Sequence, residues 1–197
     1  MPLTEETFIT AIDTIKQAYI NWELPEDSVD TWYKTLSLSI TDELLLRTTI
    51  DWVSSKTNSP NSPADIIKHG KDMYISSHDS ADASAEILLE SARSAYYVTD
   101  DFLSFDEMYR NSFASASGIP SQEVYIKENI RNRSSNPKVL ILVYDEVKGD
   151  LKSCFTGDAE HGIDFLRGQI KKKWNDKMTD AAKDFLRTGG SSGYLEA

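Results

Sequence analysis

The stretch that decides the fold runs from Trp32 to Ile67 and reads WYKTLSLSITDELLLRTTIDWVSSKTNSPNSPADII. It holds the end of one amphipathic helical pattern, a complete second pattern, a polar loop and the start of another helix. The last start is the clearest, because Ser62, Pro63 and Asp65 supply an N-cap, a proline at the first helical position and an acid at the third. The stretch predicts short helices joined by tight loops.

The same start signals occur upstream. Thr4 precedes two glutamates and predicts a helix over residues 5–22, which Pro25 ends. Asp27 or Ser28 is expected to cap a second helix, and Thr41 a third helix that runs to about Ser55. The fourth helix then runs from residue 63 to about residue 77.

Downstream of an acidic linker, apolar residues again recur at helical spacing from Ser84 to about Asp101. A capping box, Ser104 with Glu107, predicts another helix start. Ser121 is expected to cap a further helix, with its inward face formed by Val124, Tyr125 and Ile130.

The run KVLILVYDEV, residues 138–147, suits either a buried strand or a helix. We interpret it as a helix, because Asn136-Pro137 is a good helix start and no second strand pattern exists to pair with it. After Gly149 we expect a short loop that holds Cys154, then a helix from Ile163 to about Trp174. A last helix, capped by Thr179-Asp180, is expected to end at Gly189.

These patterns predict an all-α protein, a small helical bundle of short helices with a helical C-terminal extension. We expect an N-terminal helical domain over 1–77, a linker over 78–84, a second helical subdomain over 85–149, the extension over 150–188 and a flexible tail over 189–197.

Composition limits the possible functions. One cysteine excludes an internal disulfide, and His69, His78 and His161 show no ligand spacing, so we expect neither a metal site nor a cofactor. No run approaches the roughly 18 apolar residues of a membrane span, and the N-terminus lacks a signal-peptide pattern. We therefore expect a cytoplasmic protein with no membrane contact.

The acidic charge is concentrated in the first part of the chain. Residues 1–110 carry 20 acidic side chains against 8 lysines and arginines, whereas residues 111–197 carry 12 against 13. Such a field repels phosphates and favours basic protein partners, so the N-terminal part is not expected to bind DNA directly. The alternative is that this charge serves only solubility.

No catalytic pattern emerges from the sequence. It contains no phosphate-binding G-x-x-x-x-G-K-[ST] and no G-x-S-x-G around a serine. A thiolate pair of Cys154 with His161 is the one enzymatic alternative. A half-buried cysteine near a loop histidine is the simpler interpretation, so we expect a protein that is not an enzyme.

One concentrated basic feature stands out near the C-terminus. We predict it as a partner-binding surface for nucleic acid or for an acidic or amphipathic protein, with tryptophan as its anchor. The alternative is an amphipathic helix that buries the tryptophan and exposes its lysines. The residues concerned are Lys171, Lys172, Lys173, Trp174 and Lys177.

The opening stretch also carries a resemblance. The residues responsible are Ala18-Tyr19-Ile20-Asn21, Trp32-Tyr33 with Leu36, Asp42 to Leu46, and Pro60 to Ile66, which includes Pro63-Ala64-Asp65-Ile66. In order and spacing they resemble the phage replicative helicase loader/inhibitor family of phages that infect low-GC Gram-positive bacteria. A fainter resemblance continues to about residue 150, and residues 150–197 are unmatched.

The resemblance implies a phage DNA-replication protein in the cytoplasm of a bacterial host. Its partner would be a hexameric DnaB-type replicative helicase, which such proteins restrain and deliver to an origin-bound protein without an ATPase of their own. Tyr19, Trp32, Tyr33, Leu36, Pro63, Asp65 and Ile66 would then be scaffold residues rather than a site.

The charge distribution supports an alternative from another class. An acidic phage inhibitor or DNA mimic could occupy the nucleic-acid-binding surface of a host protein, for example a CRISPR nuclease, as anti-CRISPR proteins do.

Overall fold

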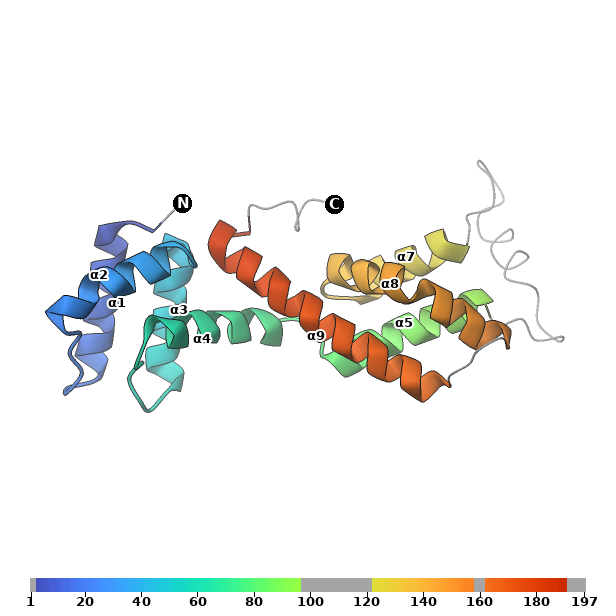
Figure 1. Cartoon of the computed structure of the whole chain (residues 1–197), viewed down its shortest axis with the longest axis horizontal. Helices are drawn as coiled ribbons and strands as arrows, with labels where there is room; N and C mark the ends of the chain where they lie inside the picture. The colour runs from blue at the N-terminus through green and yellow to red at the C-terminus, as the bar shows by residue number, and fades with distance from the viewer. Residues whose placement is uncertain (1–2, 97–121, 158–161, 191–197) are drawn as a thin grey trace. The chain divides into compact units, whose positions relative to one another are not determined.

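The structure is a computed structural model that describes residues 3–96, 122–157 and 162–190 (Figure 1). Those residues form α-helices joined by short connections, and they contain no strand. The prediction of an all-α protein is therefore confirmed. The chain divides into two compact units: unit 1 comprises Met1–Ser77 and Thr179–Ala197, and unit 2 comprises His78–Met178.

Unit 1 packs four consecutive helices with the end of a fifth. These are α1 (Glu5–Ala18), α2 (Glu26–Ser37), α3 (Asp42–Ser55), α4 (Pro63–Ser76) and the last part of α9 (Ile163–Thr188). The apolar side chains that recur at helical spacing meet in a single core. Its buried members are Leu3, Phe8, Ala11, Ile12, Ile15, Trp32, Leu36, Ile40, Leu44, Leu45, Ile66 and Leu186.

The helix starts of unit 1 follow the sequence signals, with one correction. The Thr4 hydroxyl accepts the backbone N–H of Thr7 at 3.3 Å, and the Asp65 carboxylate accepts the backbone N–H groups of Asn61 and Ser62 at 2.9 and 3.0 Å. The prediction of an Asp27 or Ser28 cap for α2 is wrong. Pro25 occupies the N-cap, because its φ of −59° already suits the entry into a helix that begins at Glu26.

Helix α1 ends at Ala18, four residues before its predicted end. The chain turns extended at Tyr19, which lets two aromatic side chains reach the connection between α3 and α4. The Tyr19 hydroxyl donates to the Lys56 carbonyl at 2.9 Å, and the Trp22 indole donates to the Pro60 carbonyl at 3.0 Å. These two hydrogen bonds hold the segment that was predicted to form the last turn of the helix.

Unit 2 consists of α5 (Ala81–Tyr96), α7 (Gln122–Arg133), α8 (Pro137–Thr156) and the first part of α9. In α7 the inward residues are Ile126 and Ile130. Val124 was predicted to face inward, but it is exposed, because the buried stripe of this helix repeats every four residues from Ile126. Tyr125 is half-buried.

The ambiguous run 138–147 lies within α8, which confirms its prediction as a helix. The Asn136 side chain caps the helix by accepting the backbone N–H of Val139 at 3.4 Å, and Pro137 occupies the first position. The predicted end near Gly149 is wrong. The buried stripe continues to Leu151, and a helical glycine costs only about 1 kcal/mol, so α8 runs on to Thr156 and ends at Gly157, whose φ is 88°.

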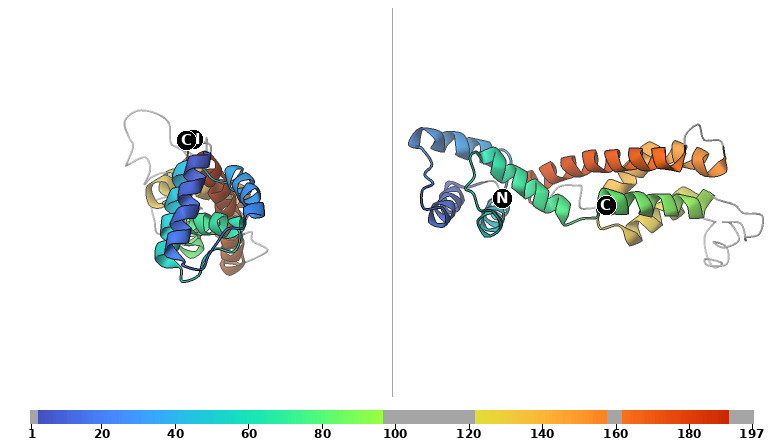
Figure 2. Two further views of the ribbon diagram at one scale, coloured as in Figure 1. Left: turned by 90° about the vertical axis from the view of Figure 1, so that its left-hand side faces the viewer. Right: turned by 90° about the horizontal axis from the view of Figure 1, so that it is seen from below.

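Helix α9 is a single element of 26 residues, seen as one unbroken ribbon in Figure 2. The prediction of two helices, with a new cap at Thr179-Asp180, is therefore wrong. Thr and Asp are tolerated inside a helix when no Gly or Pro stands next to them and the apolar stripe continues. That stripe is buried throughout and consists of Leu166, Ile170, Trp174, Met178, Ala182 and Leu186. Gly189, with φ of 66°, follows the helix as predicted.

The division into units falls at Ser77, where the sequence analysis places the end of the N-terminal domain. The other expected boundaries differ from the structure. Helix α5 begins at Ala81, inside the expected linker 78–84, and residues 150–188 form no separate extension because α8 and α9 supply core to the two units. The expected Ser104–Glu107 helix and the tail over 191–197 lie outside the described residues, as does the Ser121 cap.

Candidate functional site

Most of the predicted basic surface on α9 is engaged inside unit 2. The Lys173 and Lys177 ammonium groups both reach the Glu146 carboxylate of α8, at 2.7 and 2.6 Å, and Lys171 pairs with Asp82 of α5. Lys172 is exposed. The sequence could not indicate these partners, because Glu146 and Asp82 lie far away in the chain.

Trp174 is only 1% exposed and belongs to the core of unit 2. Its expected role as a partner anchor is therefore corrected, because a side chain that is already buried in the fold presents no surface to a partner. The helix is amphipathic, with its tryptophan buried and its lysines toward the surface. A partner-binding role of the four lysines stays a prediction.

Ion pairs recur between the other helices of unit 2. Arg167 of α9 pairs with Glu86 of α5, Arg133 of α7 with Glu90 of α5, and Lys127 of α7 with Asp145 of α8. These bonds join α5 to α7, α7 to α8, and α9 to both α5 and α8. Acids of unit 2 are thus partly neutralised by cations of the same unit.

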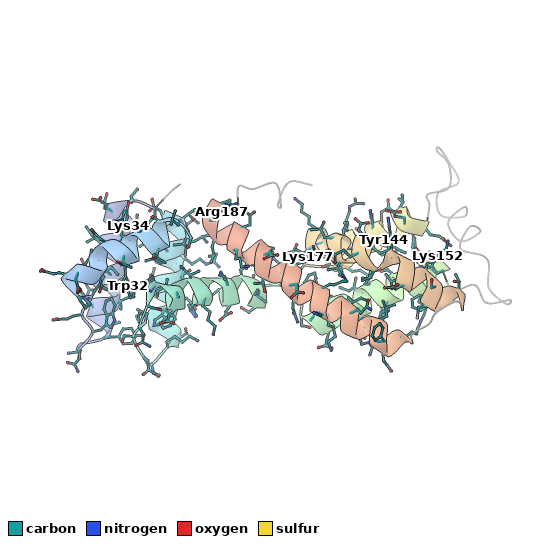
Figure 3. All side chains as sticks on the ribbon, viewed as in Figure 1. Trp32, Lys34, Tyr144, Lys152, Lys177 and Arg187 are labelled. Atoms are coloured by element: carbon teal, nitrogen blue, oxygen red, sulfur yellow. The ribbon has the colours of Figure 1, made fainter. Side chains whose placement is uncertain are left out.

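These pairs shift the titration of their members. Hydrogen bonds from Lys173 and Lys177 lower the pKa of Glu146 to about 2, and the hydrogen bonds that Lys127 donates to Glu123 and Asp145 raise the pKa of Lys127. Burial raises the pKa of Tyr144, whose hydroxyl lies 3.4 Å from that of Tyr96 (Figure 3). The ionised groups described in unit 2 are thus held in pairs that join neighbouring helices.

The residues that carry the family resemblance lie in the core and the connections of unit 1. Trp32, Leu36 and Ile66 are buried, and Tyr33 donates from its hydroxyl to the Leu3 carbonyl at 3.2 Å. Trp32 also packs edge-on against Trp22, with ring centroids 5.9 Å apart. Three further members hold the connections: Tyr19, Pro63 and Asp65. All seven act in the architecture of one unit.

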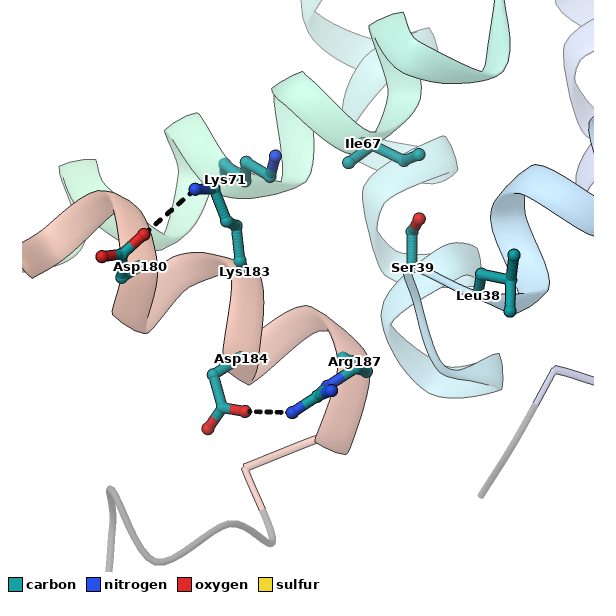
Figure 4. A pocket seen from close by; sticks show the side chains of 8 residues that line it. All are labelled: Leu38, Ser39, Ile67, Lys71, Asp180, Lys183, Asp184 and Arg187. Atoms are coloured by element: carbon teal, nitrogen blue, oxygen red, sulfur yellow. Dashed lines mark hydrogen bonds and ion pairs between the residues drawn. The ribbon is translucent and has the colours of Figure 1, made fainter.

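A groove of about 480 Å³ opens on unit 1 between the end of α2, the middle of α4 and the last turns of α9 (Figure 4). Its apolar part is formed by Leu38, which is 77% exposed, and by the half-buried Ile67. Burial of a leucine side chain is worth about 1.5 to 3 kcal/mol, and Leu38 does not gain this from the described residues of unit 1.

The rim of the groove is charged. Lys183 and Arg187 of α9 pair with Asp180 and Asp184 on their own helix, each at 3.0 Å. Lys71 of α4 has no ion pair with a residue that the structure describes. The Lys183–Asp180 pair is exposed at both members, and such pairs are weak, whereas Asp184 is only 16% exposed. The groove therefore offers three cations around an apolar centre.

Sequence reasoning missed this groove, because its lining residues come from three separate parts of the chain. The exposed leucine in Ser37-Leu38-Ser39 was the one available signal, since Leu38 falls off the apolar face that Trp32 and Leu36 define.

A second hollow, of about 610 Å³, lies between the α1–α2 and α3–α4 connections of unit 1. Ile20 stands beside it and is 94% exposed. The lining is mainly polar and includes Asn21, Asn58 and Asn61. The loop that presents Ile20 is fixed by the Tyr19 and Trp22 hydrogen bonds, so the isoleucine is displayed on an ordered support.

A histidine is buried at the α3–α4 contact of unit 1. The His69 Nε2 atom lies 2.7 Å from the Asp51 carboxylate, and the Trp52 ring packs edge-on against the imidazole at 5.2 Å. This His–Asp pair joins two helices, and no serine, threonine or cysteine is recorded as bonded to the imidazole among the described residues. It is a structural contact.

The remaining predictions concern a Cys154–His161 pair, a metal site and a membrane span. Cys154 is half-buried near the end of α8, whereas His161 lies outside the described residues, so their pairing has no geometry to report. Within residues 3–96, 122–157 and 162–190, no three His, Cys, Asp or Glu side chains gather in a way that could hold a metal ion. None of the helices in those ranges is long and apolar enough to cross a membrane.

The chain was compared with protein-family models, with curated proteins and with solved structures, and none of the three comparisons found a match.

Proposed function

We propose that this protein acts by binding another protein, and that its partner is a hexameric DnaB-type replicative helicase. The observation that carries the proposal is that the residues resembling the helicase loader/inhibitor family lie together in one unit. Trp32, Leu36 and Ile66 share its core, while Tyr19 and Asp65 fix its connections. A likeness spread along the sequence thus describes a single scaffold.

The surface of that scaffold is suited to protein contacts. Unit 1 presents exposed apolar side chains, Leu38 in the groove and Ile20 on the ordered loop, next to charged and polar groups. Apolar anchors with a polar rim are the usual anatomy of a protein interface. These two places are the natural contact points for a helicase subunit.

A binding protein of this kind would act on the helicase through differential affinity. A ligand shifts a conformational equilibrium only by as much as it prefers one state over the other. Restraint of the ATPase would follow from tighter binding to an inactive arrangement of the hexamer. Delivery at the origin would require a competing partner, such as an origin-bound protein.

The proposal is tested with the full chain and a set of DnaB-type helicases from low-GC Gram-positive bacteria. We expect co-elution with at least one hexamer on size-exclusion chromatography and a lowered ATPase rate of that helicase. A Leu36→Ala chain, destabilised in the unit 1 core, serves as the comparison. Absence of both co-elution and any change in ATPase rate across the set would sink the proposal.

A second candidate, an acidic mimic of DNA, is favoured by the exposed acids on α1 and α2. Their carboxylates lie on unit 1 away from the ion pairs that occupy the acids of unit 2: Glu5, Glu6, Asp13, Glu26, Asp27 and Asp30. A mimic would displace DNA from its target and would lose affinity steeply with salt. Binding that persists at about 0.5 M salt would count against it.

A further inference from the structure

The groove of unit 1 differs in charge from the unit that surrounds it. Its rim carries Lys71, Lys183 and Arg187, which are 3 of the 8 lysines and arginines among the described residues of unit 1. Only 2 of the 14 aspartates and glutamates in the same residues line it, Asp180 and Asp184. Unit 1 is strongly acidic, yet three of its eight described cations lie around the groove.

The arrangement of the lining specifies what could fill the groove. Leu38, which follows α2, and Ile67 of α4 are the apolar side chains of the lining, and the cations lie on α4 and α9 (Figure 4). A volume of about 480 Å³ holds a few side chains and not a folded domain. A short segment with two apolar side chains on one face and carboxylates next to them matches both features.

We propose that this groove binds an acidic, apolar-anchored peptide segment of a partner protein. Two apolar side chains of the segment lie against Leu38 and Ile67. Its carboxylates meet Lys71, which has no ion pair with a described residue, and Lys183, whose pair with Asp180 is exposed at both members and therefore weak. The Arg187 guanidinium is 69% exposed and can accept a carboxylate while it keeps its bond to Asp184. The groove proposal deepens the proposed function. It rests on that function only in assuming that the protein binds another protein.

The neighbouring acids explain how such a site would discriminate. Asp180 and Asp184 hold Lys183 and Arg187 in place in the free protein, at 3.0 Å each. A basic segment would leave Lys71 opposed by like charge, and a neutral one would make no use of the three cations. Selectivity for an acidic segment thus follows from the rim, and affinity from the two apolar side chains.

The experiment is a selection that uses the full chain as bait. A displayed library of random 12-residue peptides is enriched on the wild-type protein, with counter-selection on a Leu38→Glu variant. Since Leu38 is 77% exposed, this variant should fold, which circular dichroism and thermal unfolding verify. We expect the enriched peptides to combine aspartate or glutamate with leucine, isoleucine, phenylalanine or tryptophan.

The best peptide is then synthesised with a fluorescent label and its Kd measured by anisotropy. We expect Lys71→Glu and Leu38→Glu each to raise the Kd about tenfold or more, which a single charge reversal or a lost apolar anchor can supply. Lys68→Glu is the matched control, since Lys68 lies one turn away on the same helix and does not line the groove; its Kd should change less than about twofold.

Several results would overturn the proposal. These are enriched peptides that are basic or neutral, peptides that bind Leu38→Glu as well as wild type, or a selection that yields no peptide. Self-association abolished by Leu38→Glu would assign the groove to a second copy of the chain instead. The helicase test gives an independent result. If the protein binds the helicase but no peptide, the groove proposal is wrong and the proposed function stands. If the protein binds an acidic peptide but no helicase, the groove proposal stands and the helicase is not its partner.

Discussion

The helices of unit 2 are joined to one another by ion pairs, whereas those of unit 1 are joined mainly by apolar packing and by side chains bonded to backbone. In unit 2 Glu146 receives two lysines of α9, and α5 supplies carboxylates to both α7 and α9. In unit 1 the indole of Trp22 and the hydroxyl of Tyr19 close the connections instead.

This difference determines which charged side chains are available to a partner. In the most basic segment of the sequence, Lys171, Lys173 and Lys177 already pair with carboxylates of unit 2, and Lys172 is exposed. Unit 1 has fewer cations, yet three of them surround an apolar groove. A charged cluster in a sequence is therefore a poor guide to a binding surface until its partners in the fold are known.

The largest expected effect tests whether unit 2 depends on its buried indole. Trp174→Ala should lower the free energy of unfolding by about 3 to 5 kcal/mol, because it removes a fully buried aromatic side chain and leaves a cavity. Urea unfolding followed by circular dichroism measures it. The neighbouring Lys172→Ala, on the exposed face, should stay within about 0.5 kcal/mol. Equal stability of the two variants would show that Trp174 is not core.

The next effect tests how tightly unit 1 packs its backbones. A Cβ at Gly70 would lie 3.1 Å from both Leu186 and Thr48 side-chain atoms. Gly70→Val should therefore destabilise by about 1 to 3 kcal/mol through overpacking. At Gly168, on the unit 2 part of α9, a Cβ would meet nothing within 4 Å. Gly168→Val should be neutral or gain a few tenths of a kcal/mol from helix propensity. If Gly70→Val and Gly168→Val lower the free energy of unfolding equally, the interpretation of Gly70 as tightly packed is wrong.

A smaller effect tests the hydrogen-bonded connections of unit 1. Asp65→Ala removes the acceptor for the Asn61 and Ser62 backbone N–H groups and should cost about 0.5 to 2 kcal/mol. Amide hydrogen exchange should speed up at the start of α4. Asp72→Ala removes the same charge from the exposed side of that helix and should leave exchange there unchanged.

The smallest effect concerns the ion pairs of unit 2. Glu146 has its pKa lowered to about 2, so its contribution is present above the unfolded value of 4.5 and is lost as the pH falls from about 4.5 to about 2. Its side chain is 37% exposed, so we expect less than about 1 kcal/mol from it. Thermal unfolding across this pH range should show Glu146→Gln flatter than wild type, with Asp176→Asn as the control. If the stability of Glu146→Gln and of wild type changes with pH in parallel, the ion pairs of Glu146 do not contribute to stability.

Local signals predicted the helical class well. Asn136-Pro137 and Ser62-Pro63 mark true helix starts, and the strand alternative for 138–147 failed because the buried stripe repeats every three or four residues. The boundaries that failed depend on distant parts of the chain. Helix α9 passes through Thr179-Asp180 because Met178 and Ala182 are both buried, which the local cap signal does not reveal.

The candidate site was less predictable than the fold. The lysines near Trp174 were visible in the sequence, but their acidic partners on α5 and α8 were not, because charge pairing depends on which helices become neighbours. The groove was invisible for the same reason, since Leu38, Lys71 and Arg187 lie far apart in the chain. Residues that hold a fold can be recognised locally, whereas a surface is assembled only by the fold.

The position of Leu186 in the core of unit 1 has a consequence for synthesis. Its carbonyl also accepts the backbone N–H of Thr41 at 3.0 Å, at the start of α3. A ribosome completes the first 77 residues about a hundred residues before it adds this leucine, a delay of roughly 5 to 20 s at ordinary elongation rates. During synthesis unit 1 therefore spends that interval without the leucine that completes its core and without the carbonyl that bonds to Thr41.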